Sequence, residues 1–270
     1  MYSGSTLTNA SGRFIGAHQK IDRLAEKQLY QILGDNKNFP AINKILHFEG
    51  CNGPDGIKRK SPAQDEPKHF IRPYDDEDTE LIEIIESHFQ RLVASIKQKD
   101  EVRIAFEAAW LAHALVDGLT PAHQYPYEQK LSELRDGQGI ETRNTHKEKL
   151  MMPGSTFSKQ ISNNWKFWGP KGLFLTHAAF EMGIATIIKP IQFNKSLCQG
   201  EDMFLVTNEN IGDWFRKTAQ EVAKMNIYEE FYKNGWTRKL ALEIKKYLIP
   251  IIVRSVTLAW YGAIQQADLA

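Results

Sequence analysis

The chain has 270 residues, of which 42% are hydrophobic and 25% are charged, and its formal net charge is +1. These values are typical of a folded globular protein and exclude wholesale disorder and fibrous repeats. The near-neutral charge gives no electrostatic basis for coating a nucleic-acid duplex. Two cysteines, Cys51 and Cys198, exclude a disulfide framework and leave room for one bridge.

Hydrophobic residues recur at the helical period through most of the first half of the chain. Helices are predicted over residues 16–33, where Gly34 supplies a stop, and over residues 39–48. Residues 50–78 are rich in Gly, Pro and charge, and predict a long loop. An amphipathic helix then runs to residue 99, and a more apolar, buried helix is predicted over residues 101–119.

The second half of the chain continues the helical pattern after one polar interruption. Residues 136–170 begin with a polar, glycine-containing stretch and are predicted to form a lid or surface excursion. Further helices are predicted over residues 172–189, 208–224 and 238–266. Because no run of alternating strands and no fixed-period repeat occurs, the sequence predicts an all-α fold. We expect a single domain over residues 1–270, with seven to nine helices.

The longest apolar run lies around YLIPIIV, where Pro250 interrupts it and Arg254 ends it, so no transmembrane segment is predicted. The first residues lack the basic and apolar regions of a secretory signal. We therefore expect a cytoplasmic protein, or a secreted one if the chain is a processed form.

The string HALVDGLTPAH carries the first group of candidate functional residues. His113 and Asp117 are four residues apart, so they share one face of an apolar helix, and His123 follows after a turn. His177 and Glu181 repeat the four-residue spacing in a second apolar helix. Imidazole and carboxylate groups suit Zn²⁺, and buried polar groups need partners. The alternative is that each pair is a hydrogen bond within the core.

Three further residues complete a pattern that can be compared with known families. Asp55 and His69 are fourteen residues apart in the predicted loop, and His18 lies in the first predicted helix. Taken separately, Asp55 is part of a turn signal and His18 is a polar residue of a helix surface. In this order and spacing, the candidate residues resemble the zinc-dependent phospholipase C family, whose fold is shared with zinc-dependent single-strand-specific nucleases. The matched frame covers about residues 13–185.

The resemblance implies an all-helical domain of the phospholipase C or single-strand nuclease type, with a cluster of zinc ions at the bottom of a cleft. The implied ligands are Asp55, His69, His113 and Asp117 for one zinc, His123, His177 and Glu181 for a second, and His18 with a bridging Asp117 for a third. In the family, the amine and carbonyl of an N-terminal Trp complete the third zinc. No Trp precedes Trp110 in this chain, so we expect two zinc ions, or three if another group supplies those ligands.

The function implied by the resemblance is zinc-dependent, phospholipase C-like hydrolysis of a phosphodiester, in which the metal activates water and polarises the phosphoryl group. Asp55 is the candidate catalytic residue, which orients or deprotonates the water. The expected partner is a phosphodiester substrate, either a phospholipid head group or single-stranded nucleic acid, without an obligate protein partner. A nuclease-like phosphodiesterase and a non-catalytic zinc-binding protein of the same fold are the alternatives.

Aromatic residues near these motifs offer stacking surfaces for a substrate. They are Phe70, Tyr74, Tyr125, Tyr127, Trp165, Phe167 and Trp168, and we expect them mainly to pack the excursion onto the domain. Among the other histidines, His88 and His146 are predicted to be solvated. His47 is predicted to cap a helix or join the core, with the orientation of a zinc ligand as the alternative.

Overall fold

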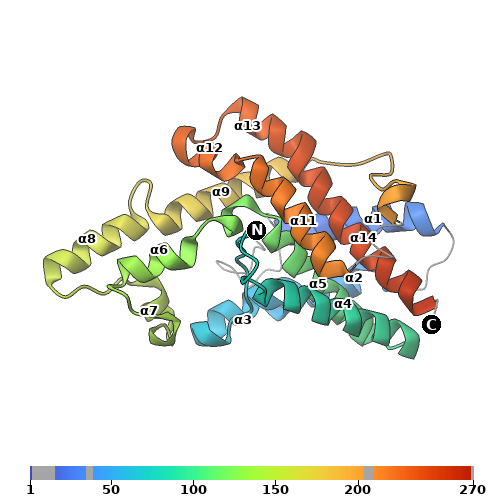
Figure 1. Cartoon of the computed structure of the whole chain (residues 1–270), viewed down its shortest axis with the longest axis horizontal. Coiled ribbons are helices and arrows are strands. Elements are labelled where there is room, and N and C mark those ends of the chain that lie inside the picture. Colours follow the sequence, from blue (N-terminus) through green and yellow to red (C-terminus); the bar gives the residue numbers. More distant parts are fainter. Residues whose placement is uncertain (2–15, 35–38, 204–209, 269–270) are drawn as a thin grey trace.

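The computed structural model describes Met1 and residues 16–34, 39–203 and 210–268, and these residues form helices without any strand (Figure 1). The prediction of an all-α fold is therefore confirmed. The α-helices are α1 (Ala17–Leu33), α2 (Ile42–His47), α3 (Pro54–Lys60), α4 (Glu80–Gln98), α5 (Glu101–Gly118), α6 (Tyr127–Leu134), α7 (His146–Leu150), α8 (Phe157–Trp168), α9 (Leu173–Ile188), α11 (Ile211–Lys224), α12 (Ile227–Asn234), α13 (Arg238–Glu243) and α14 (Ile249–Asp268). The first two residues of the helix predicted over 208–224 lie outside the described residues.

The main core forms around α5, whose sequence is apolar on nearly all sides. Helices α1, α4 and α14 pack around it, and the apolar faces of all four helices meet in one continuous cluster of buried side chains. The buried indole of Trp260 on α14 donates from Nε1 to the Ala108 carbonyl of α5 at 3.0 Å. Beyond its exposed first turn α5 is buried on most sides, so Glu107, His113 and Asp117 lie inside the protein and must find partners there.

One long helix at the C-terminal end accommodates a proline without breaking. The helix continues from α13 through a π-helical turn (Ile244–Leu248) into α14, and the Ile249 amide donates to the Ile244 carbonyl five residues back. A proline normally clashes with the carbonyl four residues earlier and removes one hydrogen bond. The wider turn immediately before Pro250 relieves that conflict, so the helix continues through Pro250, as predicted over residues 238–266.

This helical run, Arg238–Asp268, is long and apolar enough to cross a membrane by length and composition alone. However, 72% of its most apolar window is buried inside the fold. That burial is what the core helix of a folded domain shows.

The segment predicted as a long loop is partly helical. Residues 50–78 contain α3 and two short 3₁₀ turns, Gly50–Asn52 and Ala63–Asp65. Pro54 stands in the first turn of α3, where a proline is tolerated because that amide needs no partner within the helix. Glycine and proline just before a helix or in its first turn can start a short helix as well as prevent one. The prediction of a loop over residues 50–78 is therefore wrong for the part that forms α3.

The predicted excursion forms an arm at one end of the molecule. Helices α6, α7 and α8 lie together at the left of Figure 1, away from the bundle of α1, α4, α5 and α14. The arm has a small core of its own, separate from the main one, built on Leu131, Met152 and Phe167. The arm is therefore an ordered helical structure, joined to the bundle through α9.

Candidate metal centre

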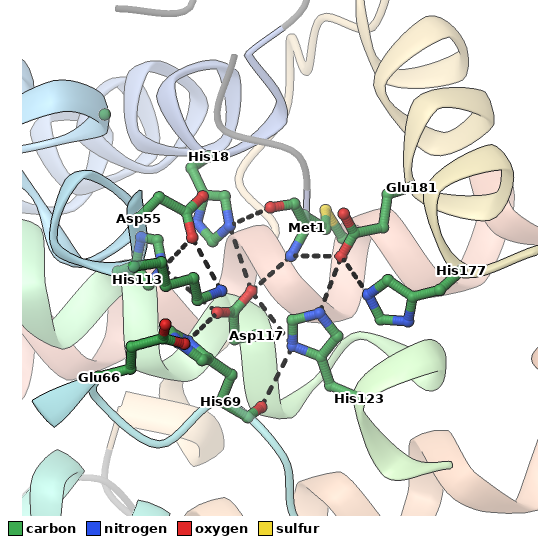
Figure 2. A network of polar contacts seen from close by, with 12 residues as sticks. Met1, His18, Asp55, Glu66, His69, His113, Asp117, His123, His177 and Glu181 are labelled. Atoms are coloured by element: carbon green, nitrogen blue, oxygen red, sulfur yellow. Dashed lines mark hydrogen bonds and ion pairs between the residues drawn. The ribbon is translucent and has the colours of Figure 1, made fainter. Parts of the chain in front are cut away.

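A cavity of about 1000 Å³ opens between the arm and the main bundle. Residues from five separate parts of the chain line one side of it, and Figure 2 shows the polar contacts among them. The predicted site residues that line the cavity are Asp55, His69, His123, His177 and Glu181, and Met1 and Lys58 line it with them. His18, His113 and Asp117 are buried and lie in contact with these residues.

Asp117, in the last turn of α5, is the hub of the cluster. One carboxylate oxygen, Oδ2, lies 2.9 Å from His69 Nδ1 and 3.2 Å from His113 Nε2. The other oxygen, Oδ1, lies 3.3 Å from both His18 Nε2 and His123 Nδ1. Four imidazoles from four different segments therefore surround one carboxylate, and His18, His113 and Asp117 bring one donor atom each to within 4.8 Å of one another.

A second group joins the turn after α5 to helix α9. Glu181 Oε1 accepts from His123 Nε2 at 2.8 Å and lies 3.1 Å from His177 Nε2. The two imidazole rings stack with their centroids 5.2 Å apart. The spacing of His177 and Glu181, one helical turn, brings both side chains to the same side of α9 and toward His123.

The start of the chain enters the same cluster, which sequence reasoning did not foresee. The Met1 ammonium forms an ion pair with Asp117 and lies 3.5 Å from Glu181 Oε1. The Met1 carbonyl oxygen accepts from His18 Nε2 at 2.8 Å. Met1 thus directs both its amine and its carbonyl toward His18 and Asp117 (Figure 2). No local sequence signal announces this contact, because it joins residues more than a hundred positions apart.

Asp55 belongs to the first turn of α3 and reaches the cluster from the cavity side. Its Oδ1 lies 2.9 Å from Lys58 Nζ and 3.8 Å from His113 Nε2. The backbone at this point is tightly held, because a Cβ on Gly56 would lie 2.2 Å from the Cys51 carbonyl oxygen. Only glycine permits that approach of α3 to the preceding turn, so Gly56 helps to fix the position of Asp55.

Sequence reasoning missed Glu49, whose side chain is fully buried. Its Oε1 accepts from His113 Nδ1 at 2.8 Å, which leaves His113 Nε2 directed toward Asp117. A carboxylate on the far nitrogen of an imidazole is a common way to orient a metal-binding histidine. Asp22, one helical turn after His18, is also buried, and its carboxyl interacts with Glu49.

The predictions for the three other histidines can be compared directly with the structure. His88 is buried, not solvated as predicted, and its Nδ1 is 2.5 Å from Oε2 of the buried Glu107. His47 is exposed at the end of α2, so it does not join the core, which was one of the two roles predicted for it, and its ring contacts Phe48 edge-on. The His113 ring is held instead by Glu49, two residues after His47. His146 is exposed, as expected. Cys51 and Cys198 are not joined by a disulfide, so the one bridge that the sequence allowed is not formed.

The electrostatics of the cluster follow from burial and close packing. Burial lowers the pKa of His69 to about 3 and that of His123 to about 4. Burial also opposes a charge on His113, but the carboxylates of Glu49 and Asp117 outweigh it and raise its pKa to about 10. Burial acts against ionisation of Asp117 as well, yet the imidazole of His123 and the Met1 ammonium hold the pKa of that carboxyl well below its usual range.

The donor atoms fit a transition metal such as zinc. Among the described residues, the buried nitrogens His113 Nε2, His69 Nε2 and His177 Nδ1 have no hydrogen-bond partner. His113 Nε2 is also the atom that faces Asp117 and Asp55. Buried nitrogens of this kind carry a cost unless something binds them, and imidazole with carboxylate is a donor set that zinc prefers.

Aromatic side chains form part of the cavity wall. Phe70 and Tyr127 line the cavity and stack on each other with centroids 5.3 Å apart. Phe167 is buried in the small core of the arm, and the Trp168 indole packs on Phe174 and donates to the Leu150 carbonyl, as predicted for packing residues. Trp165 is 68% exposed, so the expectation that the aromatic residues mainly pack the excursion is wrong for this indole.

Comparison with known proteins found no protein-family model, no curated protein and no solved structure that matches this chain. The functional conclusion therefore rests on the chemistry of the cluster and on the motif resemblance alone.

Proposed function

We propose that this protein is a zinc-dependent phosphodiester hydrolase of the phospholipase C-like type. The observation that carries the proposal is the meeting of two potential metal-binding groups, His18–His113–Asp117 and His123–His177–Glu181, beside one cavity. A structural role alone needs no cavity of this size next to its ligands. Catalytic zinc sites differ from structural ones in being open to substrate and water.

The proposed ligand sets follow the contacts around Asp117 and Glu181. Asp55, His69, His113 and Asp117 would hold one ion, and His123, His177 and Glu181 would hold a second. For the third, the Met1 amine and carbonyl lie beside His18 and Asp117, and would provide the ligands that the absence of an early Trp seemed to remove. In a protein that begins at Met1 we therefore propose three ions, in place of the two expected from the sequence.

The chemistry that zinc supplies in such a donor set is Lewis-acid polarisation of a phosphoryl group and acidification of water. Asp55 borders the cavity and would orient a water directed at phosphorus. Burial favours its neutral form, but Lys58 and His113 outweigh burial and hold the pKa of its carboxyl below the usual range, so it would act as a hydrogen-bond acceptor in its charged form. Lys58 stays protonated, because Asp55 and Asp117 outweigh burial and raise its pKa. Its ammonium, 2.9 Å from Asp55, would stabilise negative charge that develops on the phosphoryl oxygens.

A single-strand nuclease-like activity is the second candidate. The observation in its favour is the stacked pair Phe70 and Tyr127 on the cavity wall, since aromatic rings beside a phosphodiester site can stack with a base. A panel of phospholipid vesicles and single-stranded oligonucleotides separates the two activities.

The first experiment is zinc analysis of protein purified without chelator, together with hydrolysis of a chromogenic phosphodiester. We expect bound zinc, and turnover that stops with chelator and returns with zinc. Glu181→Gln should lose zinc. Replacing a residue that only orients a metal ligand typically costs about 10- to 100-fold in activity, so the loss of turnover in Glu181→Gln should be larger than that. His146→Ala, which changes an exposed histidine outside the cluster, is the matched control.

Two results would contradict the proposal. Protein that holds no zinc even after reloading would mean that the paired imidazoles and carboxylates are hydrogen bonds of the core. Zinc without turnover on any diester of the panel would favour a binding protein that uses the metal for stability.

The third ion has its own test. Adding one residue before Met1 would displace the amine from Asp117, so we expect the zinc content to fall by one ion per chain. The same addition after Ala270 is the control. If the two extended proteins contain the same amount of zinc, the Met1 amine does not bind metal.

A further inference from the structure

Helix α8 carries an apolar stripe that nothing in the described structure covers. Phe157, Ile161 and Trp165 follow one another at four-residue intervals and are 78%, 55% and 68% exposed. Residues four apart share a helix face, so these three side chains form one apolar strip along the outer side of the helix. Trp168, in the last turn, packs on Phe174 and donates to the Leu150 carbonyl, so it belongs to the arm.

The stripe is not an extension of the core of the arm. The buried residues of α8 are Asn163 and Phe167, and they lie on a different side of the helix from Phe157, Ile161 and Trp165. Phe167 packs in the small cluster with Leu131 and Met152, which closes that face. Helix α8 is therefore apolar on two sides, one turned into the protein and one turned out.

The charges around the stripe have one sign. Residues 150–180 contain three lysines and no Asp or Glu. Lys159 lies 3.7 Å from Asp136 Oδ1, an exposed and therefore weak pair. Lys166 and Lys171 are exposed and make no ion pair with any residue that the structure describes. This segment therefore presents exposed apolar side chains together with positive charge. The complementary surface is one that has a layer of negatively charged groups over an apolar interior.

We propose that α8 docks on the surface of an anionic lipid bilayer, with Phe157, Ile161 and Trp165 inserted at the interface. Interfacial helices combine an apolar face containing Trp, Phe or Leu with lysines elsewhere on the helix, and Trp is favoured at the headgroup level. Lys166 and Lys171 would add electrostatic attraction to anionic lipids.

A second copy of the chain is the less favoured occupant. In a symmetric dimer the same patch contacts itself, so two copies of the positively charged segment of residues 150–180 would approach each other. The location of the stripe also fits a membrane surface. Helix α8 belongs to the arm at one end of the molecule (Figure 1). The next helix, α9, contributes Phe174 and His177 to the cavity wall.

The test is sedimentation of the full chain with phosphatidylcholine vesicles, with and without phosphatidylserine. All samples contain chelator, so binding is measured without turnover and does not depend on the proposed hydrolase. We expect the protein to sediment with the phosphatidylserine vesicles. The variant Phe157→Ser/Ile161→Ser/Trp165→Ser should lose at least about tenfold in partitioning. Lys166→Glu/Lys171→Glu should lose about fivefold or more for each lysine, on the anionic vesicles only.

The matched control removes equally exposed apolar side chains elsewhere, as Val102→Ser/Leu242→Ser/Tyr247→Ser. It should bind as the parent does, and far-ultraviolet circular dichroism establishes that each variant is folded. Failure of the parent to bind anionic vesicles overturns the proposal, as does an equal loss in the control. Self-association of the parent in analytical ultracentrifugation that the stripe variant abolishes, without vesicle binding, would assign the stripe to a second copy instead.

Discussion

At the residue scale, Glu49 is the side chain that best separates a metal centre from an ordinary polar core. It accepts from His113 Nδ1 at 2.8 Å and so directs His113 Nε2 toward Asp117. Glu49→Gln keeps the size of the side chain and removes its charge. We expect zinc affinity to fall about 10- to 100-fold, measured by competition with a chromogenic chelator, with the fold retained.

The chain offers a close control for that change. Glu107 is also fully buried and also bonded to a histidine, His88, but it belongs to the contact between α4 and α5. Glu107→Gln should leave zinc affinity unchanged. If the two variants alter zinc affinity equally, the effect of Glu49 is on general stability and not on the orientation of His113.

Asp22 gives a prediction about pH. Burial and the charge of Glu49 raise the pKa of Asp22 well above its usual range. The folded protein therefore keeps a proton that the unfolded chain releases at about pH 3.9, so this residue lowers the free energy of unfolding as pH rises above that value. Asp22→Asn cannot ionise, and should resist urea better than the parent at pH 7 and equally well below pH 4.

The exposed Asp76 provides the control, because Asp76→Asn should change stability at neither pH. A stability gain for Asp22→Asn that is larger in acid than at neutral pH would contradict the assigned pKa direction.

At the element scale, α3 depends on one glycine. A Cβ at position 56 would meet the carbonyl oxygen and carbon of Cys51 at 2.2 and 2.6 Å, and backbone atoms cannot move aside as a flexible side chain can. Gly56→Ala should therefore cost about 1–3 kcal/mol in the free energy of unfolding, measured with urea, and should weaken zinc binding by moving Asp55. Gly200→Ala is the control, since a Cβ there meets nothing within 4 Å. Unchanged zinc binding in folded Gly56→Ala would mean that Asp55 is not a ligand.

The helices could be predicted from the sequence wherever the apolar period is long. The pattern predicted α1, α4, α5 and α9 because their buried faces repeat over several turns. The pattern failed for α3, which is only seven residues long. Gly53, Pro54 and Gly56 lie just before or within its first turn, and such residues usually indicate a loop. A helix of two turns is held by tertiary contacts, which a single sequence does not display.

The same distinction applies to the candidate site. The four-residue spacings of His113 with Asp117 and of His177 with Glu181 are local, so the sequence shows them. Glu49 and Met1 reach the cluster across 64 and 116 positions, and no period or motif marks such contacts. Physical proximity between distant segments is set by the packing of the whole bundle, which only the structure supplies.

At the scale of the whole molecule, the cluster joins the start of the chain, α1, α3, α5 and α9. A ligand that binds only the folded state stabilises it, by about 2.7 kcal/mol when its concentration is a hundred times its Kd. For a chain of this size each kcal/mol corresponds to roughly 2–4 °C in Tm. Zinc loading should therefore raise Tm by several degrees in differential scanning fluorimetry, and chelator should reverse the change.

His177→Ala should reduce that shift, whereas His47→Ala, an exposed histidine, should leave it intact. A Tm that is the same with zinc and with chelator would show that metal does not bind to the folded cluster.

The π-helical turn before Pro250 marks a place where the last long helix can lose one residue. The π-turn is closed by a hydrogen bond between residues five apart, so it holds one residue more than an α-turn. The buried faces of the helix before and after the turn remain aligned. Removing one residue inside Ile244–Leu248, with Pro250 replaced, would restore an ordinary helix and keep Trp260 facing Ala108. The same deletion elsewhere before Trp260 would rotate that indole by about 100° away from α5. The helix therefore has one turn where the deletion of a single residue is geometrically neutral.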